Sequence, residues 1–207
     1  MGFYTEAQRA MQERYGARIL ADTVEDAIVW DNVEGLAQEF IESRDFFFLS
    51  TVDGESRPTV SYKGGPVGMV QVRDTKTLVF PAYDGNGMFK SLGSIEETAK
   101  IGMLFIDFET ANRVRVQGEA KLLQDRALVG DFPGAIGVVE VAVESCFLNC
   151  ARYIHKHSRA EISPYVPAKD GSQPHPSWKR IDFVQAALPQ EDRQRTAQEG
   201  GEIKMDD

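Results

Sequence analysis

Residues 46–66 read FFFLSTVDGESRPTVSYKGGP and contain the pattern that decides the fold. The first seven residues are dominated by aromatic and β-branched side chains, which favour a β-strand. Asp53-Gly54 follows them and is typical of a tight hairpin turn. Residues 58–62 then return as a second strand. The stretch therefore predicts an antiparallel hairpin whose second strand leads Lys63 into a glycine-rich turn.

Strand patterns continue at short intervals along the chain. Five more are recognisable, at residues 67–73, 77–80, 101–108, 113–123 and 137–146. One helix of about ten residues, 87–98, separates them, whereas a parallel α/β sheet needs helices between most strands. The order therefore predicts a mainly β (α+β) protein, with six to seven antiparallel strands in a small barrel.

The two ends of the chain have different patterns. Residues 5–20 and about 32–44 show the apolar spacing of helices, and Asp31-Asn32 is a typical N-cap. After Cys150 the strand pattern breaks up, and residues 189–207 are so polar that we expect disorder there. We predict a barrel domain over residues 1–160, with N-terminal helices and one internal helix, and an extended C-terminal segment over 161–207.

The amino-acid composition argues against several classes of function. The 207 residues carry a formal charge of −9 and a sequence pI near 4.9. Non-specific binding to nucleic acid or to an anionic membrane needs a basic surface, so neither partner is expected. No apolar run approaches the roughly 18–20 residues of a membrane span. Two cysteines make no disulfide framework. These features predict a cytoplasmic globular protein that holds any anionic ligand in a local positive pocket.

Two glycine-rich turns are suited to holding a phosphate group. Lys63 ends a strand before Gly64-Gly65, and a second strand runs into Gly85-Asn86-Gly87 before a helix. A lysine charge, free backbone N–H groups and a helix N-terminus all bind phosphate. Asn86 and Ser91 would add side-chain hydrogen bonds. From spacing alone, an exposed hairpin lysine and an ordinary capped turn are the favoured explanation of the same residues.

Two further groups of polar residues have simpler explanations. Arg113, Arg115 and Gln117 alternate with core-facing valines, so they form a row that is either solvated or covered by a second subunit. Cys146, Cys150, His155 and His157 lack the spacing of a zinc motif. No metal site is predicted.

The motifs together resemble a known family. S-x-K-G-G-P at residue 61, P-x-Y-x-G-N at residue 81 and S-L-G-x-I at residue 91 are similar to the pyridoxamine 5′-phosphate oxidase-like flavoproteins, over roughly residues 35–125. The resemblance implies a split β-barrel, bound flavin mononucleotide (FMN), and a homodimer with flavin sites at the subunit interface. The cofactor-binding positions that it implies are Ser61, Tyr62, Lys63, Pro81, Ala82, Asn86, Met88, Ser91 and Arg113.

The resemblance also shapes the functional expectation. It implies an oxidoreductase that transfers hydride at flavin N5 to or from an unknown small substrate. A non-enzymatic flavin- or haem-binding module, serving as sensor or store, is the alternative, and a haem would use His155 or His157. The family commonly has a basic residue at the position of Gly87, and the C-terminal segment lacks the substrate pattern of the true oxidases. No catalytic acid or base is identified.

Overall fold

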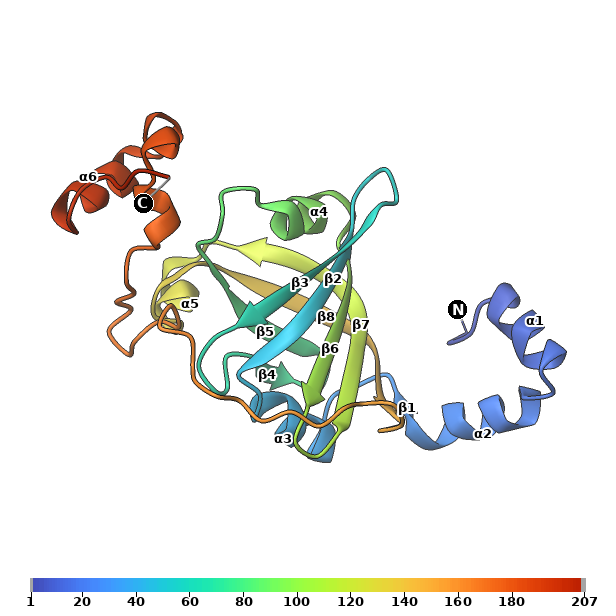
Figure 1. Ribbon diagram of the computed structural model, residues 1–207. Helices are drawn as coiled ribbons and strands as arrows, with labels where there is room; N and C mark the ends of the chain where they lie inside the picture. The colour runs from blue at the N-terminus through green and yellow to red at the C-terminus, as the bar shows by residue number, and fades with distance from the viewer. Residues whose placement is uncertain (1, 206–207) are drawn as a thin grey trace.

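Eight antiparallel strands form one continuous sheet in the computed structural model, which describes residues 2–205. The sheet order is β3-β2-β6-β7-β8-β5-β4. The strands are β2 (Phe46–Val52), β3 (Pro58–Gly64), β4 (Gln71–Asp74), β5 (Thr77–Tyr83), β6 (Lys100–Asp107), β7 (Asn112–Leu123) and β8 (Ala135–Asn149). A two-residue strand, β1 (Val29–Trp30), pairs with β8. Within residues 2–205 no ladder joins β3 to β4, so the sheet curves without closing (Figure 1). The predicted antiparallel split barrel is confirmed.

The core lies inside the curved sheet because alternate residues of each strand point inward. In β2, Phe47 is fully buried, and its ring centroid lies 5.0 Å from that of Phe80 and 5.3 Å from that of Phe105. Val114 and Val116 of β7 are buried as the alternation predicts. Large aromatic groups thus join β2, β5 and β6 across the interior, where their burial is a main source of stability.

The helices lie around the barrel and at its two ends. They are α1 (Glu6–Arg14), α2 (Arg18–Ile28), α3 (Gly35–Glu42), α4 (Lys90–Thr98), α5 (Arg126–Gly130) and α6 (Gln190–Gln198), with 3₁₀ turns η1 (Ser177–Arg180) and η2 (Asp182–Ala187). The sequence predicted one helix over residues 5–20, but Gly16 has a φ of +62° and separates α1 from α2. The α1–α2 pair projects away from the barrel (Figure 1). Among the described residues, no helix combines the length and apolar character of a membrane span.

Helix α4 is fixed to the β2–β3 hairpin along its length. The Ser91 hydroxyl in its first turn lies 2.9 Å from the Ser61 hydroxyl of β3. At its other end, Glu97 accepts a 2.8 Å hydrogen bond from the Gly54 amide, and the Thr98 hydroxyl donates a 2.6 Å bond to the Val52 carbonyl. These three contacts set the direction in which the N-terminus of α4 points.

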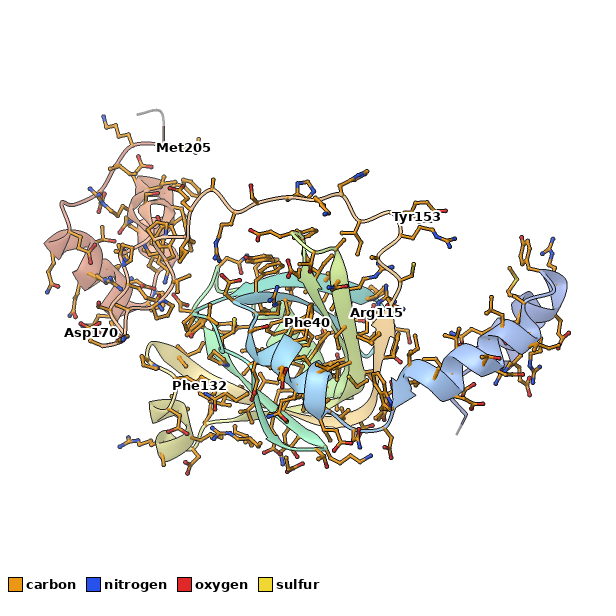
Figure 2. The ribbon with its side chains drawn as sticks, turned by 90° about the horizontal axis from the view of Figure 1, so that it is seen from below. Phe40, Arg115, Phe132, Tyr153, Asp170 and Met205 are labelled. Carbon is orange, nitrogen blue, oxygen red and sulfur yellow. The ribbon has the colours of Figure 1, made fainter. Side chains whose placement is uncertain are left out.

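The C-terminal segment crosses the barrel and folds at its far end. Residues 151–176 run from the β1 end to the opposite side, a path that Tyr153 and Asp170 mark in Figure 2. There η1, η2 and α6 pack together, whereas the sequence predicted disorder from residue 189 onward. Residues 206 and 207, included in that prediction, lie outside the described residues. The division of the chain at residue 160 stays a prediction.

Candidate functional site: a pocket between the barrel and the C-terminal segment

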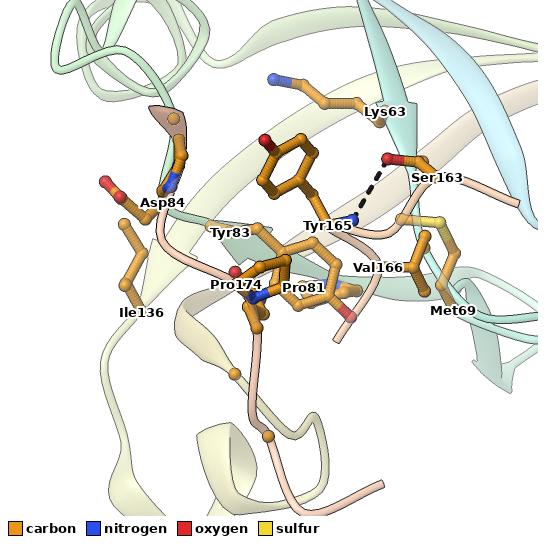
Figure 3. A pocket seen from close by; sticks show the side chains of 18 of the residues that line it. Lys63, Met69, Pro81, Tyr83, Asp84, Ile136, Ser163, Tyr165, Val166 and Pro174 are labelled. Carbon is orange, nitrogen blue, oxygen red and sulfur yellow. Dashed lines mark hydrogen bonds between the residues drawn. The ribbon is translucent and has the colours of Figure 1, made fainter. Parts of the chain in front are cut away.

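One pocket brings the barrel and the C-terminal segment together. Its volume is about 1080 Å³, slightly above the roughly 300–1,000 Å³ that small-molecule sites occupy. Figure 3 shows its two walls. The barrel contributes Lys63, Met69, Pro81 and Tyr83, among others, and the C-terminal segment contributes Ser163, Tyr165, Val166 and Pro174. The pocket therefore depends on residues that are about a hundred positions apart in the sequence.

Lys63 supplies a positive charge to this pocket. Alternation along β3 places Ser61 and Lys63 on the more buried face, while Val60 and Tyr62 are exposed. Burial lowers the pKa of the Lys63 ammonium. Within residues 2–205 it forms no ion pair and no side-chain hydrogen bond. A partly buried cation without a counter-charge is a ready partner for an anionic ligand.

The N-terminus of α4 lies against β3, the strand that carries Lys63. Phe89 precedes the helix in the left-handed conformation, with φ +49°, and no side chain caps the first turn. The sequence predicted a helix start at Gly87, three residues too early. Ser91 is buried and hydrogen-bonded to Ser61, which is two residues from Lys63 on the same face of β3. An uncapped helix N-terminus, two hydroxyls and a lysine thus gather at one edge of the barrel, where they can bind a phosphate.

The turn before α4 is formed by glycine and an asparagine side chain. Asn86 Oδ1 accepts a 3.1 Å hydrogen bond from the Met88 amide, and both side chains are exposed. Gly87 has a φ of +74°, in the region that favours glycine, and a Cβ there would meet no atom within 4 Å. Backbone conformation, rather than lack of space, therefore favours glycine at this position.

The structure brings together some of the nine sequence-predicted residues and separates others. Tyr62, Lys63, Pro81 and Ala82 line the pocket. Ser61 and Ser91 form the hydroxyl pair behind Lys63, and Asn86 and Met88 lie on the exposed turn.

Arg113 lies on β7, away from the pocket lining, and its guanidinium donates a 2.9 Å hydrogen bond to the Cys150 carbonyl. Within one chain, Arg113 is therefore not part of this site.

The C-terminal wall was missed by sequence reasoning. Tyr165, His175, Trp178 and Lys179 all line the pocket. His175 is buried, with Nε2 2.9 Å from the Thr196 hydroxyl, and burial together with the nearby Arg195 lowers its pKa. The proline-rich composition of this stretch indicated only an extended loop. Nothing in its local pattern shows where such a loop docks.

The Cys–His group does not gather into a site. Cys146 is buried in β8, and burial raises the pKa of its thiol to about 11, whereas Cys150 is exposed. The His157 ring meets Phe108 edge-on at 5.3 Å. In the part of the chain that the structure describes, no three His, Cys, Asp or Glu side chains cluster as metal ligands would.

A family model described as pyridoxamine 5′-phosphate oxidase matches residues 33–148, more than half of the chain. No curated protein matches the chain.

Several solved structures are similar in fold. HupZ of Group A Streptococcus is 19% identical, with a TM-score of 0.45, and the alignment covers 58% of this chain and 95% of HupZ. An FMN-binding protein of Syntrophomonas wolfei is 14% identical, with a TM-score of 0.40 and coverage of 68% and 97%. HutZ, a haem storage protein of Vibrio cholerae, is 17% identical, with a TM-score of 0.37 and coverage of 53% and 89%.

Proposed function

Because the chain belongs to the pyridoxamine 5′-phosphate oxidase family, a family of flavin-binding proteins, we propose that it binds FMN in the pocket and acts as an oxidoreductase. The observation that carries the proposal is Lys63, which forms no ion pair within residues 2–205 and lies on β3 two residues from Ser61, whose hydroxyl contacts Ser91 in the uncapped first turn of α4. This is the arrangement that a terminal phosphate requires.

The phosphate would be held by groups from two elements. Lys63 supplies the charge, the first turn of α4 supplies backbone N–H groups, and the Ser61–Ser91 pair supplies hydroxyl donors. The Gly85-Asn86-Gly87 turn leaves open space, since a Cβ at either glycine would meet no atom within 4 Å. The donor set therefore fits a phosphate monoester, although Gly87 contributes no positive charge.

The flavin ring would lie against the β5 end of the barrel. Pro81 and Ala82 present small, buried side chains there, and Gly64 and Gly65 keep the end of β3 free of side chains. A Cβ at Gly65 would come within 2.9 Å of the Met69 sulfur, so the Met69 side chain would have to shift to admit any larger residue. Tyr165 and Val166 line the opposite side of the pocket. When bound, the flavin supplies hydride transfer at N5, and the protein supplies binding and orientation.

We further propose that the active form is a homodimer whose partner completes the flavin site. Val60 and Tyr62 are exposed on β3, and the Tyr62 ring stacks on Phe46 with a centroid distance of 5.3 Å. Phe108 also stacks on Phe46, with a centroid distance of 6.0 Å, so half-buried rings lie beside the exposed Tyr62. Arg113 and Arg115 lie on the outward face of β7. A second subunit covering such a face would bury apolar area that one chain leaves in water.

The visible spectrum of the purified protein tests the proposed function. Flavin absorption bands, either on purification or after uptake of added FMN, are expected. A Soret band would support a haem-binding module instead, and a colourless protein that takes up no FMN would contradict the proposal. Oxidation of a reduced nicotinamide by the flavin-loaded protein would distinguish an enzyme from a binding module. Sedimentation of the loaded protein tests the dimer, because a monomer that binds FMN tightly would exclude a shared site.

A further inference from the structure

Lys179 is a buried lysine that joins the C-terminal segment to the barrel. Only 5% of its surface is exposed. Its Nζ lies 2.5 Å from Oδ2 of Asp84, which directly follows β5, and 3.0 Å from both carboxylate oxygens of Asp192 in α6. The ammonium therefore has all three of its donors directed at carboxylates, one of which belongs to a residue 95 positions earlier in the chain.

The backbone of Lys179 is held as firmly as its side chain. Its amide donates to the Pro176 carbonyl at 3.0 Å, and its carbonyl accepts from the Gln185 amide group at 2.7 Å and from the Thr196 hydroxyl at 3.3 Å. Burial lowers the pKa of the ammonium, but the hydrogen bonds and charges of Asp84 and Asp192 outweigh this and raise it above its usual value. Lys179 thus presents a fixed positive charge to Asp84.

Asp84 begins the turn that leads to the phosphate-binding end of α4. The turn contains Gly85 and Gly87, and its internal side-chain contacts come from Asn86 and Met88. Two glycines give the backbone much freedom, so an external contact at Asp84 restricts where the turn can lie. The Asp84 carboxylate would also repel a phosphate bound nearby, unless a cation neutralises it.

We propose that Lys179 is a positioning residue for the phosphate of the bound flavin. It fixes the turn before α4 through Asp84 and neutralises the Asp84 carboxylate, so that Lys63 and the α4 N-terminus face the phosphate in one arrangement. This inference rests on the proposed function, because it requires a phosphorylated ligand at that turn. It gives the C-terminal segment, outside the part matched by the family model, a role in cofactor choice.

The ratio of the dissociation constants for riboflavin and FMN tests the role, because the two ligands differ only in the phosphate. Lys179→Met should lower the ratio about tenfold, the change expected when hydrogen bonding to a charged group is lost, mainly by weakening FMN binding. Gln185→Leu is the matched control: it removes the hydrogen bond to the Lys179 backbone carbonyl, lies outside the pocket lining and leaves every charge in place, so the ratio should not change. Lys179→Met/Asp84→Asn should recover part of the ratio, because the repelling charge is removed.

The outcomes separate this inference from the proposed function. If the wild type prefers FMN and Lys179→Met keeps the same preference, Lys179 has no role at the phosphate and the inference is wrong. Equal falls for Lys179→Met and Gln185→Leu would also overturn it, since they would reflect packing of the C-terminal segment alone. A wild type that does not distinguish FMN from riboflavin overturns both proposals. If Lys179→Met does not fold, the same ratio of dissociation constants is measured for Lys179→Gln. An unchanged ratio in that variant would again show that the inference is wrong.

Discussion

Replacing Lys63 with methionine separates the binding role of this residue from its effect on stability. The substitution keeps most of the apolar stem and removes the ammonium. A hydrogen bond to a charged group contributes roughly 1.5–3 kcal/mol. Losing it at the phosphate should therefore raise the dissociation constant for FMN by about 10- to 150-fold. Lys156→Met is the matched control, since Lys156 is an exposed lysine away from the pocket. It should leave FMN binding unchanged.

Lys63→Met should weaken FMN binding but should stabilise the ligand-free protein. Burial lowers the pKa of Lys63, so the folded state binds this proton less tightly than the unfolded chain does. The ionised lysine therefore destabilises the fold, and the effect is fully present below the folded-state pKa and disappears as the pH rises through the ordinary lysine pKa. Lys63→Met should consequently raise the free energy of unfolding of the ligand-free protein at neutral pH.

Two measurements decide between these outcomes. Quenching of flavin fluorescence during titration gives the dissociation constant, and thermal unfolding without ligand gives the stability. An unchanged dissociation constant would remove Lys63 from the phosphate site. A lower melting temperature of the ligand-free variant would refute the claim that its charge is held without a counter-charge.

Three further predictions concern other parts of the fold. Ser91→Ala should weaken FMN binding by about 0.5–1.5 kcal/mol, the range for one neutral hydrogen bond. An equal loss of affinity for riboflavin would show that Ser91 does not act on the phosphate. Phe47→Ala should lower the free energy of unfolding by about 3–5 kcal/mol, because it empties the centre of the core; urea denaturation measures this, and a loss below about 1 kcal/mol would contradict the packing described. Cys150 should react with a thiol reagent in the native protein while Cys146 should not, because Cys146 is buried and its pKa is raised to about 11; labelling of both thiols without unfolding would refute that burial.

The barrel was predictable from sequence because its signals are local. Period-two alternation identified β2, β3 and β7 to within two residues, and Asp53-Gly54 marked the first hairpin. The start of α4 was less predictable. Phe89 adopts a left-handed conformation that nothing in its own residue type favours, so the helix begins at Lys90.

The second wall of the pocket was not predictable, because its contacts are long-range. Lys179 reaches Asp84 across 95 positions, and neither residue belongs to a periodic pattern. Helix α6 was missed for a related reason. Its composition is strongly polar, and the contacts of Thr196 and Asp192 with His175 and Lys179 link it to the rest of the fold. Such contacts depend on how distant segments of the chain meet. The local sequence pattern carries no information about this.

An equilibrium titration of the purified wild-type protein with FMN, and separately with riboflavin, tests the central claim most directly. The structure predicts saturable binding of one FMN per chain and much weaker binding of riboflavin, because Lys63, the α4 N-terminus and the Ser61–Ser91 pair act on the phosphate. Absence of FMN binding, or equal affinity for the two flavins, would contradict the proposed site.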